Sequence, residues 1–302
     1  MICIFNPEHD LCLANGGRNY VPPASARTFA AESCGLMGLL YPSARCISAT
    51  GAAMLPEEDG PIVPWGWDMT LKGWLLRQGV PERMMPSDAM LADWRELQHR
   101  TSWLPLQPHS RAVTTPGEIE RMLTHCPDLV MKAPWSGSGR GLRWVSGKMT
   151  DHDRAWLDRV VRTQRCVIVE PRWVVCYDYA LEYRIDAEGL TFGGFSLFDT
   201  ANGVYRGNRL LPDEEIASIV GFQPELRTTL ERWLLENVAP RYRGPLGVDI
   251  IRDSEGNHHV AEINLRHTMG MIAHAYLALH QELKGKLFVP TVKHYSSDVD
   301  NR

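Results

Sequence analysis

The sequence has no long apolar run, no excess of basic residues and no paired cysteine motif, and each absence argues against a class of protein. No apolar stretch approaches the ~20 residues that a transmembrane helix needs. The net charge of −4 gives no basic field that would attract nucleic acid. The seven cysteines are scattered without a Cys-x-x-Cys pair, as is typical of reduced thiols. The N-terminus lacks the basic segment of a signal peptide, so we expect a cytoplasmic protein that binds neither membrane nor nucleic acid.

The length of 302 residues predicts about two domains, and the first third of the chain has the pattern of a small α/β domain. Residues 2–5 are expected to form a strand, followed by a long polar loop over residues 6–19. A helical region over 23–40 and a strand over 45–49 come next. Polar loops that directly follow a strand are where α/β folds place ligands, so the loop is a candidate binding segment.

The stretch 246–270 contains two β-branched runs joined by turn residues, which predicts a hairpin. The runs are 248–251 and 260–265, and the turn covers 253–257.

This hairpin carries Asp249, Glu262 and Asn264 where a buried strand favours apolar residues. Because side chains alternate along a strand, Glu262 and Asn264 share a face, and folding back about the turn brings Asp249 near Glu262. Converging carboxylate and amide oxygens favour a magnesium ion held jointly with substrate phosphates. The same residues are equally compatible with a hairpin whose polar face is turned to water.

A second stretch has glycine-rich phosphate-binding character. A short apolar strand over 129–132 ends in Lys132, and residues 135–141 follow with three glycines and Arg140. Glycines let backbone N–H groups approach an anion closely. No Gly-Lys-Ser/Thr follows and the next element is expected to be a strand, which excludes a Walker loop and a dinucleotide fingerprint. Alone, the pattern is also compatible with a plain flexible hairpin.

Together these stretches resemble the ATP-grasp superfamily, in the type of the carbamoyl phosphate synthetase large chain and of D-alanine–D-alanine ligase. The order is similar: a strand lysine, a glycine-rich lid, a strand ending in Glu170, an aspartate strand and a Glu-x-Asn strand. The resemblance implies an α/β (α+β) fold in which two lobes with antiparallel sheets clamp ATP behind a small α/β N-terminal domain. We expect the N-terminal domain at 1–100, the small lobe with its lid at 101–165 and the large lobe with the metal-binding hairpin at 166–302.

The resemblance also assigns residues to ATP and magnesium. Those implied to bind nucleotide are Lys132, Ser136, Gly137, Ser138, Gly139, Arg140 and Gly141 in the strand and lid, Glu170, Pro171, Arg172 and Trp173 in the adenine hinge, and Glu182 at the ribose. Asp249, Glu262 and Asn264 are implied to bind a pair of magnesium ions. Arg266 is similar to an arginine that helps hold the transferring phosphate, although Leu265 precedes it where those relatives have proline.

Arginines outside these motifs are further candidates. The resemblance implies that a loop expected over 199–212 faces the acceptor substrate or the γ-phosphate, so we predict that its Arg206 and Arg209 anchor an anionic group, with Arg209 counted among the catalytic residues. It also implies an arginine that reaches a nucleotide phosphate from a helix expected over 88–101, where Arg95 and Arg100 are the two candidates. Solvated arginines are the alternative in both places.

The resemblance implies an ATP- and Mg²⁺-dependent ligase that joins a carboxylate to an amine or another nucleophile through an acyl phosphate. Lys132, Arg266 and Arg209 are its expected catalytic residues. The partners are ATP and a small-molecule or peptide substrate, and a homodimer is compatible with this prediction. The alternatives are a small-molecule kinase on the same fold and a nucleotide-binding protein without turnover.

Overall fold

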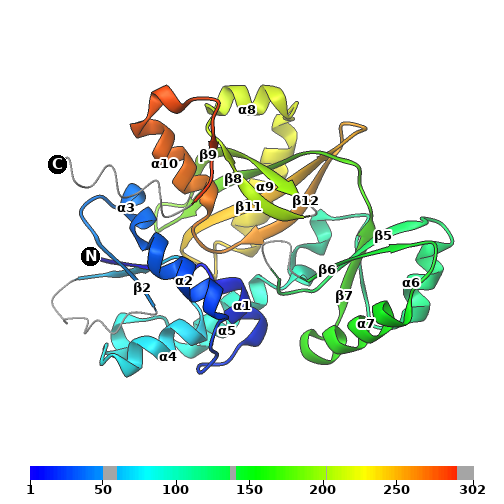
Figure 1. The fold of residues 1–302 in the computed structure, drawn as a ribbon, viewed down its shortest axis with the longest axis horizontal. Helices are drawn as coiled ribbons and strands as arrows, with labels where there is room; N and C mark the ends of the chain where they lie inside the picture. The colour runs from blue at the N-terminus through cyan, green and yellow to red at the C-terminus, as the bar shows by residue number, and fades with distance from the viewer. Residues whose placement is uncertain (50–59, 137–140, 202, 291–302) are drawn as a thin grey trace.

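The computed structural model describes residues 1–49, 60–136, 141–201 and 203–290, and within them the strands form three sheets (Figure 1). The predicted lid residues Gly137, Ser138, Gly139 and Arg140 lie outside the described residues. No helix in the described ranges is both long and apolar enough to cross a membrane.

The N-terminal unit is a parallel sheet, in the order β2-β1-β3, with helices packed around it. Its strands are β1 (Ile2–Phe5), β2 (Arg45–Ser48) and β3 (Ile62–Pro64). Its helices are α1 (His9–Asn15), α2 (Ala24–Ser33), η1 (Cys34–Leu36), α3 (Met37–Leu40), α4 (Met69–Arg77), η3 (Glu82–Met84) and α5 (Asp88–Leu97), and η4 (Arg100–Leu106) leads out of the unit.

Two predictions for this unit are corrected. The segment 6–19 is not all loop, because α1 forms within it and buries His9, Cys12 and Leu13 at the three- and four-residue spacing of a helix face. The helix expected over 88–101 ends at Leu97, so Arg100 lies on η4 instead.

The small lobe is an antiparallel sheet, in the order β4-β7-β5-β6, covered by two helices. The elements are β4 (Arg111–Val113), α6 (Pro116–Leu123), β5 (Asp128–Lys132), β6 (Leu142–Ser146), α7 (Asp151–Gln164) and β7 (Val167–Pro171). α7 begins with a capping box, because the Thr150 side chain accepts from the Asp153 N–H and the Asp153 carboxylate accepts from the Thr150 N–H. β7 pairs with β4 and β5, so the sheet extends beyond residue 165, the end predicted for this lobe.

The large lobe is a six-stranded antiparallel sheet, in the order β12-β11-β8-β9-β10-β13. Its elements are β8 (Val175–Ile185), β9 (Leu190–Ala201), β10 (Val204–Arg209), α8 (Asp213–Ile219), α9 (Pro224–Asn237), β11 (Gly244–Asp253), β12 (His258–Asn264), α10 (Met269–Leu279), η5 (Gln281–Leu283) and β13 (Leu287–Phe288). The loop expected over 199–212 is wrong for most of its length, because β9 continues through Ala201 and β10 pairs with it.

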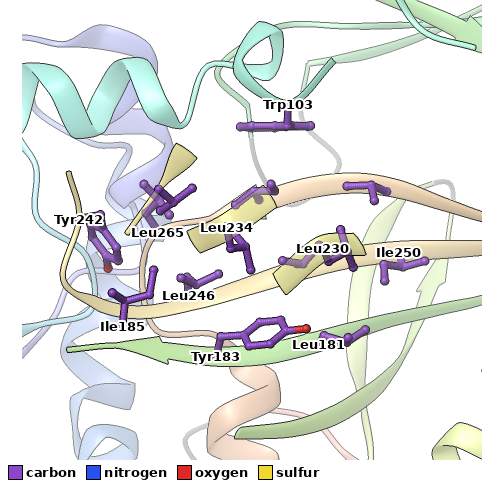
Figure 2. Packing of buried hydrophobic residues seen from close by; sticks show 14 of the residues in the cluster. Trp103, Leu181, Tyr183, Ile185, Leu230, Leu234, Tyr242, Leu246, Ile250 and Leu265 are labelled. Carbon is purple, nitrogen blue, oxygen red and sulfur yellow. The ribbon is translucent and has the colours of Figure 1, made fainter. Parts of the chain in front are cut away.

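The core of the large lobe lies on one face of this sheet. Leu230 and Leu234 of α9 pack against β8 and β11 side chains such as Tyr183 and Leu246, as Figure 2 shows. Because strand side chains alternate, burying one set on this face sends the other set to the opposite face. That opposite face of β8, β9 and β11 carries the polar residues of the candidate site.

Candidate active site

A cavity of about 500 Å³ lies where the N-terminal unit, the small lobe and the polar face of the large sheet meet. Acidic side chains outnumber basic ones among the described residues that line it. The charged lining residues are Glu8, Asp10, Arg100, Lys132, Asp178, Glu182, Asp249, Glu262 and Arg266.

The β11–β12 hairpin brings its three predicted metal ligands together. Asp249 pairs with Glu262 across the two strands, and the Asn264 amide donates to the Asp249 carboxylate at 3.1 Å. Burial, followed by the nearby carboxylates of Glu262 and Glu182, raises the pKa of Asp249 to about 8. Burial also raises the pKa of Glu262. The juxtaposition of Asp249 and Glu262 expected from the sequence is therefore confirmed.

Arg100 provides a cation to this acidic hairpin from a different part of the chain. Its guanidinium lies 3.0 Å from Glu262 Oε1 and also donates to the Ser136 carbonyl at 3.4 Å. Arg95 points elsewhere: its guanidinium carbon lies 3.5 Å above the Trp135 ring, and its Nε donates to the Leu13 carbonyl at 2.6 Å. Of the two arginines left open by the sequence, Arg100 is the one that reaches the cavity.

Arg266 joins the hairpin to the N-terminal unit. Its Nε and Nη2 donate to the two carboxylate oxygens of Asp10 at 3.0 and 2.9 Å, and Nη2 also donates to Asn264 Oδ1 at 3.0 Å. Although burial raises the pKa of Asp10, Arg266 outweighs that effect, and the pKa lies below its ordinary value. The bidentate pair fixes the guanidinium beside the predicted metal ligands.

Lys132 lies at the end of β5, where it forms an ion pair with buried Glu170 of β7. The Ser110 hydroxyl donates to the second Glu170 oxygen at 3.1 Å. Of the two lid residues within the described ranges, Ser136 lines the cavity, and Gly141 has a φ of +79°, a conformation that favours glycine.

None of the predicted hinge residues 170–173 is among the described residues that line the cavity. Arg172 is exposed, and the Trp173 ring stacks on His259 with a centroid separation of 3.9 Å. Contact between adenine and the backbone of Glu170, Pro171, Arg172 and Trp173 stays a prediction.

Two acidic residues of β8 face the cavity at different depths. Glu182, predicted at the ribose, is 2% exposed and accepts a hydrogen bond from Ser196 at 2.9 Å. Asp178, four residues earlier and so on the same strand face, accepts from Thr200 at 2.7 Å and feels the charge of Lys132. Sequence reasoning missed Asp178, yet counting back from Glu182 by the strand period of two would have found it.

Arg209, predicted to be catalytic, is not among the described lining residues, whereas its neighbour Asn208 is. Its guanidinium donates to both oxygens of Asp199 at 2.9 and 3.0 Å, and its side chain is 51% exposed. The β-strand alternation of β10 explains the difference, because consecutive residues point to opposite faces. The geometry therefore favours Asn208 over Arg209 as a cavity residue.

Solved structures of other proteins share the fold of this chain. No family model matches the chain, and curated proteins give no match. The structure is similar to N5-carboxyaminoimidazole synthetase from Staphylococcus aureus, solved with ADP, at 12% identity and a TM-score of 0.52, over 96% of this chain and 79% of the other. D-alanyl-alanine synthetase A from Vibrio cholerae O1 biovar eltor str. N16961 is similar at 17% identity and a TM-score of 0.52, over 93% of each chain. Likeness at this identity confirms the predicted fold.

Proposed function

We propose that this chain, which has the ATP-grasp fold, is an ATP-dependent ligase that joins a carboxylate to an amine or another nucleophile through an acyl phosphate. One observation supports this most strongly. Three cations, Arg100, Lys132 and Arg266, meet the acidic β11–β12 hairpin in one cavity bordered by both lobes and the N-terminal unit. Transfer of a phosphoryl group needs cations around the transferring phosphate, and this cavity brings them together.

The hairpin residues fit magnesium. Asp249 and Glu262 supply two carboxylates and Asn264 an amide oxygen, which are donors that this ion accepts. The raised pKa values of both acids indicate that their negative charges are poorly compensated by the protein alone. When bound there, magnesium would offset the charge of the nucleotide phosphates.

For the nucleotide, we assign Lys132 to the phosphates, the lid residues 136–141 to a cover over them, and the backbone of the hinge 170–173 to adenine. We place the ribose hydroxyls at Asp178 rather than at Glu182. Asp178 lies near Lys132 and Thr200, whereas Glu182 lies deeper, beside Ser196.

In the reaction, an oxygen of the substrate carboxylate attacks the γ-phosphorus of ATP, and the bond from that phosphorus to the bridging oxygen breaks, which gives an acyl phosphate and ADP. The nucleophile then attacks the acyl carbon and releases phosphate. Arg100 and Arg266 hold the transferring group by charge and hydrogen bonds, and Asp10 fixes the orientation of Arg266. The acceptor lies between the segment with Glu8 and the strand with Asn208, both of which border the cavity.

The product distinguishes this proposal from its alternatives. Purified protein is incubated with Mg·ATP and a library of carboxylates and amines, and both ADP and new adducts are measured by mass spectrometry. A ligated product with equimolar ADP supports the ligase. ADP with a phosphorylated hydroxyl compound identifies a kinase, and binding of Mg·ATP without any ADP release identifies a nucleotide-binding protein.

A further inference from the structure

Glu182 is a buried acid with an unused oxygen, and the nucleotide site does not account for it. It is 2% exposed and lines the cavity. Its Oε1 accepts a hydrogen bond from Ser196 at 2.9 Å, whereas its buried Oε2 has no partner within hydrogen-bonding geometry among the described residues, although the Thr268 side chain is near enough to lower the pKa of Glu182. A buried carboxylate oxygen without a donor is costly, so such an atom points to a ligand that supplies one.

The chain leaves room for this carboxylate with two glycines. A Cβ at Gly270, in the first turn of α10, would lie 2.1 Å from Glu182 Oε1. A Cβ at Gly247 of β11 would lie 2.9 Å from Glu182 Oε2. Neither glycine has a positive φ, so the need at both positions is for space rather than for an unusual backbone. The missing side chains of these two glycines therefore leave the space that the Glu182 carboxylate occupies.

The protein's own cations are engaged elsewhere. Each basic residue that lines the cavity in the described ranges pairs with another acid: Arg100 with Glu262, Lys132 with Glu170, and Arg266 with Asp10. Glu182 also does not complete a metal centre. Within the described residues, no three His, Cys, Asp or Glu side chains are placed to hold a metal ion, so Glu182 does not form a three-acid site with Asp249 and Glu262, although its carboxylate is near enough to raise the pKa of Asp249.

We propose that Glu182, with Ser196 and Thr268, binds the protonated primary amine of the acceptor substrate. This inference rests on the proposed ligase function and assigns the nucleophilic amine to a place in the cavity. Before the nitrogen attacks the acyl carbon, the ammonium group gives one proton to the Glu182 carboxylate, because only the neutral amine has a free electron pair. An ammonium group offers three N–H donors and a positive charge. Burial raises the pKa of Glu182 to about 7, and an ammonium group beside Oε2 would favour the charged carboxylate. The Ser196 and Thr268 hydroxyl oxygens at the same wall provide neutral acceptors. A protonated tertiary amine has a single N–H donor and a quaternary ammonium has none, so the site around Glu182 favours primary amines.

The probe is methylammonium chloride, added to the full chain in saturating Mg·ADP at constant ionic strength, with thermal unfolding as the readout. Methanol tests a neutral hydroxyl, tetramethylammonium tests a cation without N–H donors, and additional MgCl₂ tests a divalent cation. The variant is Glu182→Gln. The matched control is Glu188→Gln, which removes the same charge from an exposed position in the turn of the same β8–β9 hairpin.

We expect methylammonium to raise the melting temperature beyond the Mg·ADP value in the wild type and in Glu188→Gln, and methanol and tetramethylammonium to have no such effect. Glu182→Gln should keep the Mg·ADP shift and weaken methylammonium binding about tenfold or more, the loss expected for a charge-assisted hydrogen bond. The inference is overturned if Glu182→Gln responds like the wild type, if any other probe matches methylammonium, or if methylammonium has no effect on the wild type. If Glu182→Gln does not fold, the response of the wild type to the four probes still tests whether the cavity binds a primary ammonium group. Absence of any Mg·ADP shift in the wild type would instead overturn the proposed function.

Discussion

Two hairpins of the large sheet carry charged residues, and they place those charges in opposite ways. In the β11–β12 hairpin, Asp249 and Glu262 are neighbours of like charge on the cavity face, and the cation beside Glu262 comes from Arg100 on η4. In the β9–β10 hairpin, Asp199 and Arg209 have opposite charges and pair with each other, with side chains 37% and 51% exposed.

The difference shows what marks a functional hairpin in this molecule. Asp199 and Arg209 satisfy each other locally, and a solvent-exposed pair of this kind needs nothing further. Among the described ion pairs, none joins Asp249 or Glu262 to a cation of β11 or β12, so these acids depend on the distant Arg100 and, in our proposal, on magnesium and nucleotide. A charge that the local structure leaves uncompensated is thus the better indicator of a binding site. Four predictions test this contrast.

The largest effect is expected at the acidic hairpin. Glu262→Gln keeps the shape of the side chain and removes its charge, so the fold should survive while ADP release falls by about 100-fold or more. The measurement is the rate of ADP release with Mg·ATP and the carboxylate and amine library. Glu255→Gln, at an exposed position in the turn of the same hairpin, is the control and should be as active as the wild type. If Glu262→Gln released ADP as fast as Glu255→Gln, the β11–β12 hairpin would have no role in catalysis.

The next effect concerns nucleotide binding by the small lobe. Mg·ATP at saturating concentration should raise the melting temperature of the wild type by several degrees if its affinity is micromolar. Lys132→Ala should lose most of this rise, because Lys132 is the buried cation at the end of β5. Each variant is compared with its own nucleotide-free form, since leaving Glu170 unpaired is itself destabilising. Exposed Lys148, replaced by alanine, is the control, and a full rise in Lys132→Ala would contradict the assignment.

A smaller effect is the pH dependence of stability in the absence of nucleotide and metal. The pKa of Asp249 is raised from 3.8 to about 8, so the folded chain keeps a proton that the unfolded chain releases. The contribution of Asp249 to the free energy of unfolding is largest at low pH, and it is lost as the pH rises toward about 8. His267 acts in the opposite direction, because its pKa is lowered from 6.5 to about 4, but its contribution no longer changes above about pH 6.5.

We therefore expect the melting temperature of the nucleotide-free chain to fall between about pH 6.5 and pH 8. Glu8 and Glu182, whose pKa values burial raises to about 7, act in the same direction up to about pH 7. Asp249→Asn removes the acid that titrates highest and should reduce this slope, most clearly between about pH 7 and pH 8. Thermal unfolding across the pH range provides the measurement. A slope that is unchanged in Asp249→Asn would show that the acidic hairpin is not under electrostatic strain.

The smallest effect is expected at the β9–β10 hairpin. Arg209→Ala breaks an exposed ion pair, so it should cost at most about 1 kcal/mol of the free energy of unfolding. The rise in melting temperature with Mg·ATP should stay unchanged. Loss of ADP release in Arg209→Ala would support the catalytic role predicted from the sequence. It would also contradict the view that the charges of the β9–β10 hairpin, unlike those of β11–β12, have no part in the reaction.

Local rules predicted much of this fold. The turn residues and alternating pattern of 246–270 predicted both the hairpin and the approach of Asp249 to Glu262. The capping box at Thr150 and the apolar stripe of 224–238 are likewise local signals, and they match α7 and α9. In each case, the signal lies within a few residues of the feature that it predicts.

The failures have a common physical origin in contacts between distant segments. Asp10 and Arg266 are 256 residues apart in the chain, and nothing local indicates that they pair. α1 was expected to be loop because its short amphipathic face is surrounded by polar residues, and tertiary packing decides its conformation. The resemblance implies an anion-binding role for Arg209 in a loop, whereas its position on β10 directs its side chain to Asp199.

The central claim is that this cavity activates a carboxylate with ATP, and trapping the activated product tests it most directly. Hydroxylamine converts an acyl phosphate into a stable hydroxamate and needs no amine subsite. The protein is therefore incubated with Mg·ATP, hydroxylamine and the carboxylate library, and hydroxamate and ADP are quantified together. The account predicts equimolar hydroxamate and ADP for at least one carboxylate, with both products lost in Glu262→Gln. ADP release without hydroxamate for every carboxylate, or hydroxamate formation undiminished in Glu262→Gln, would contradict it.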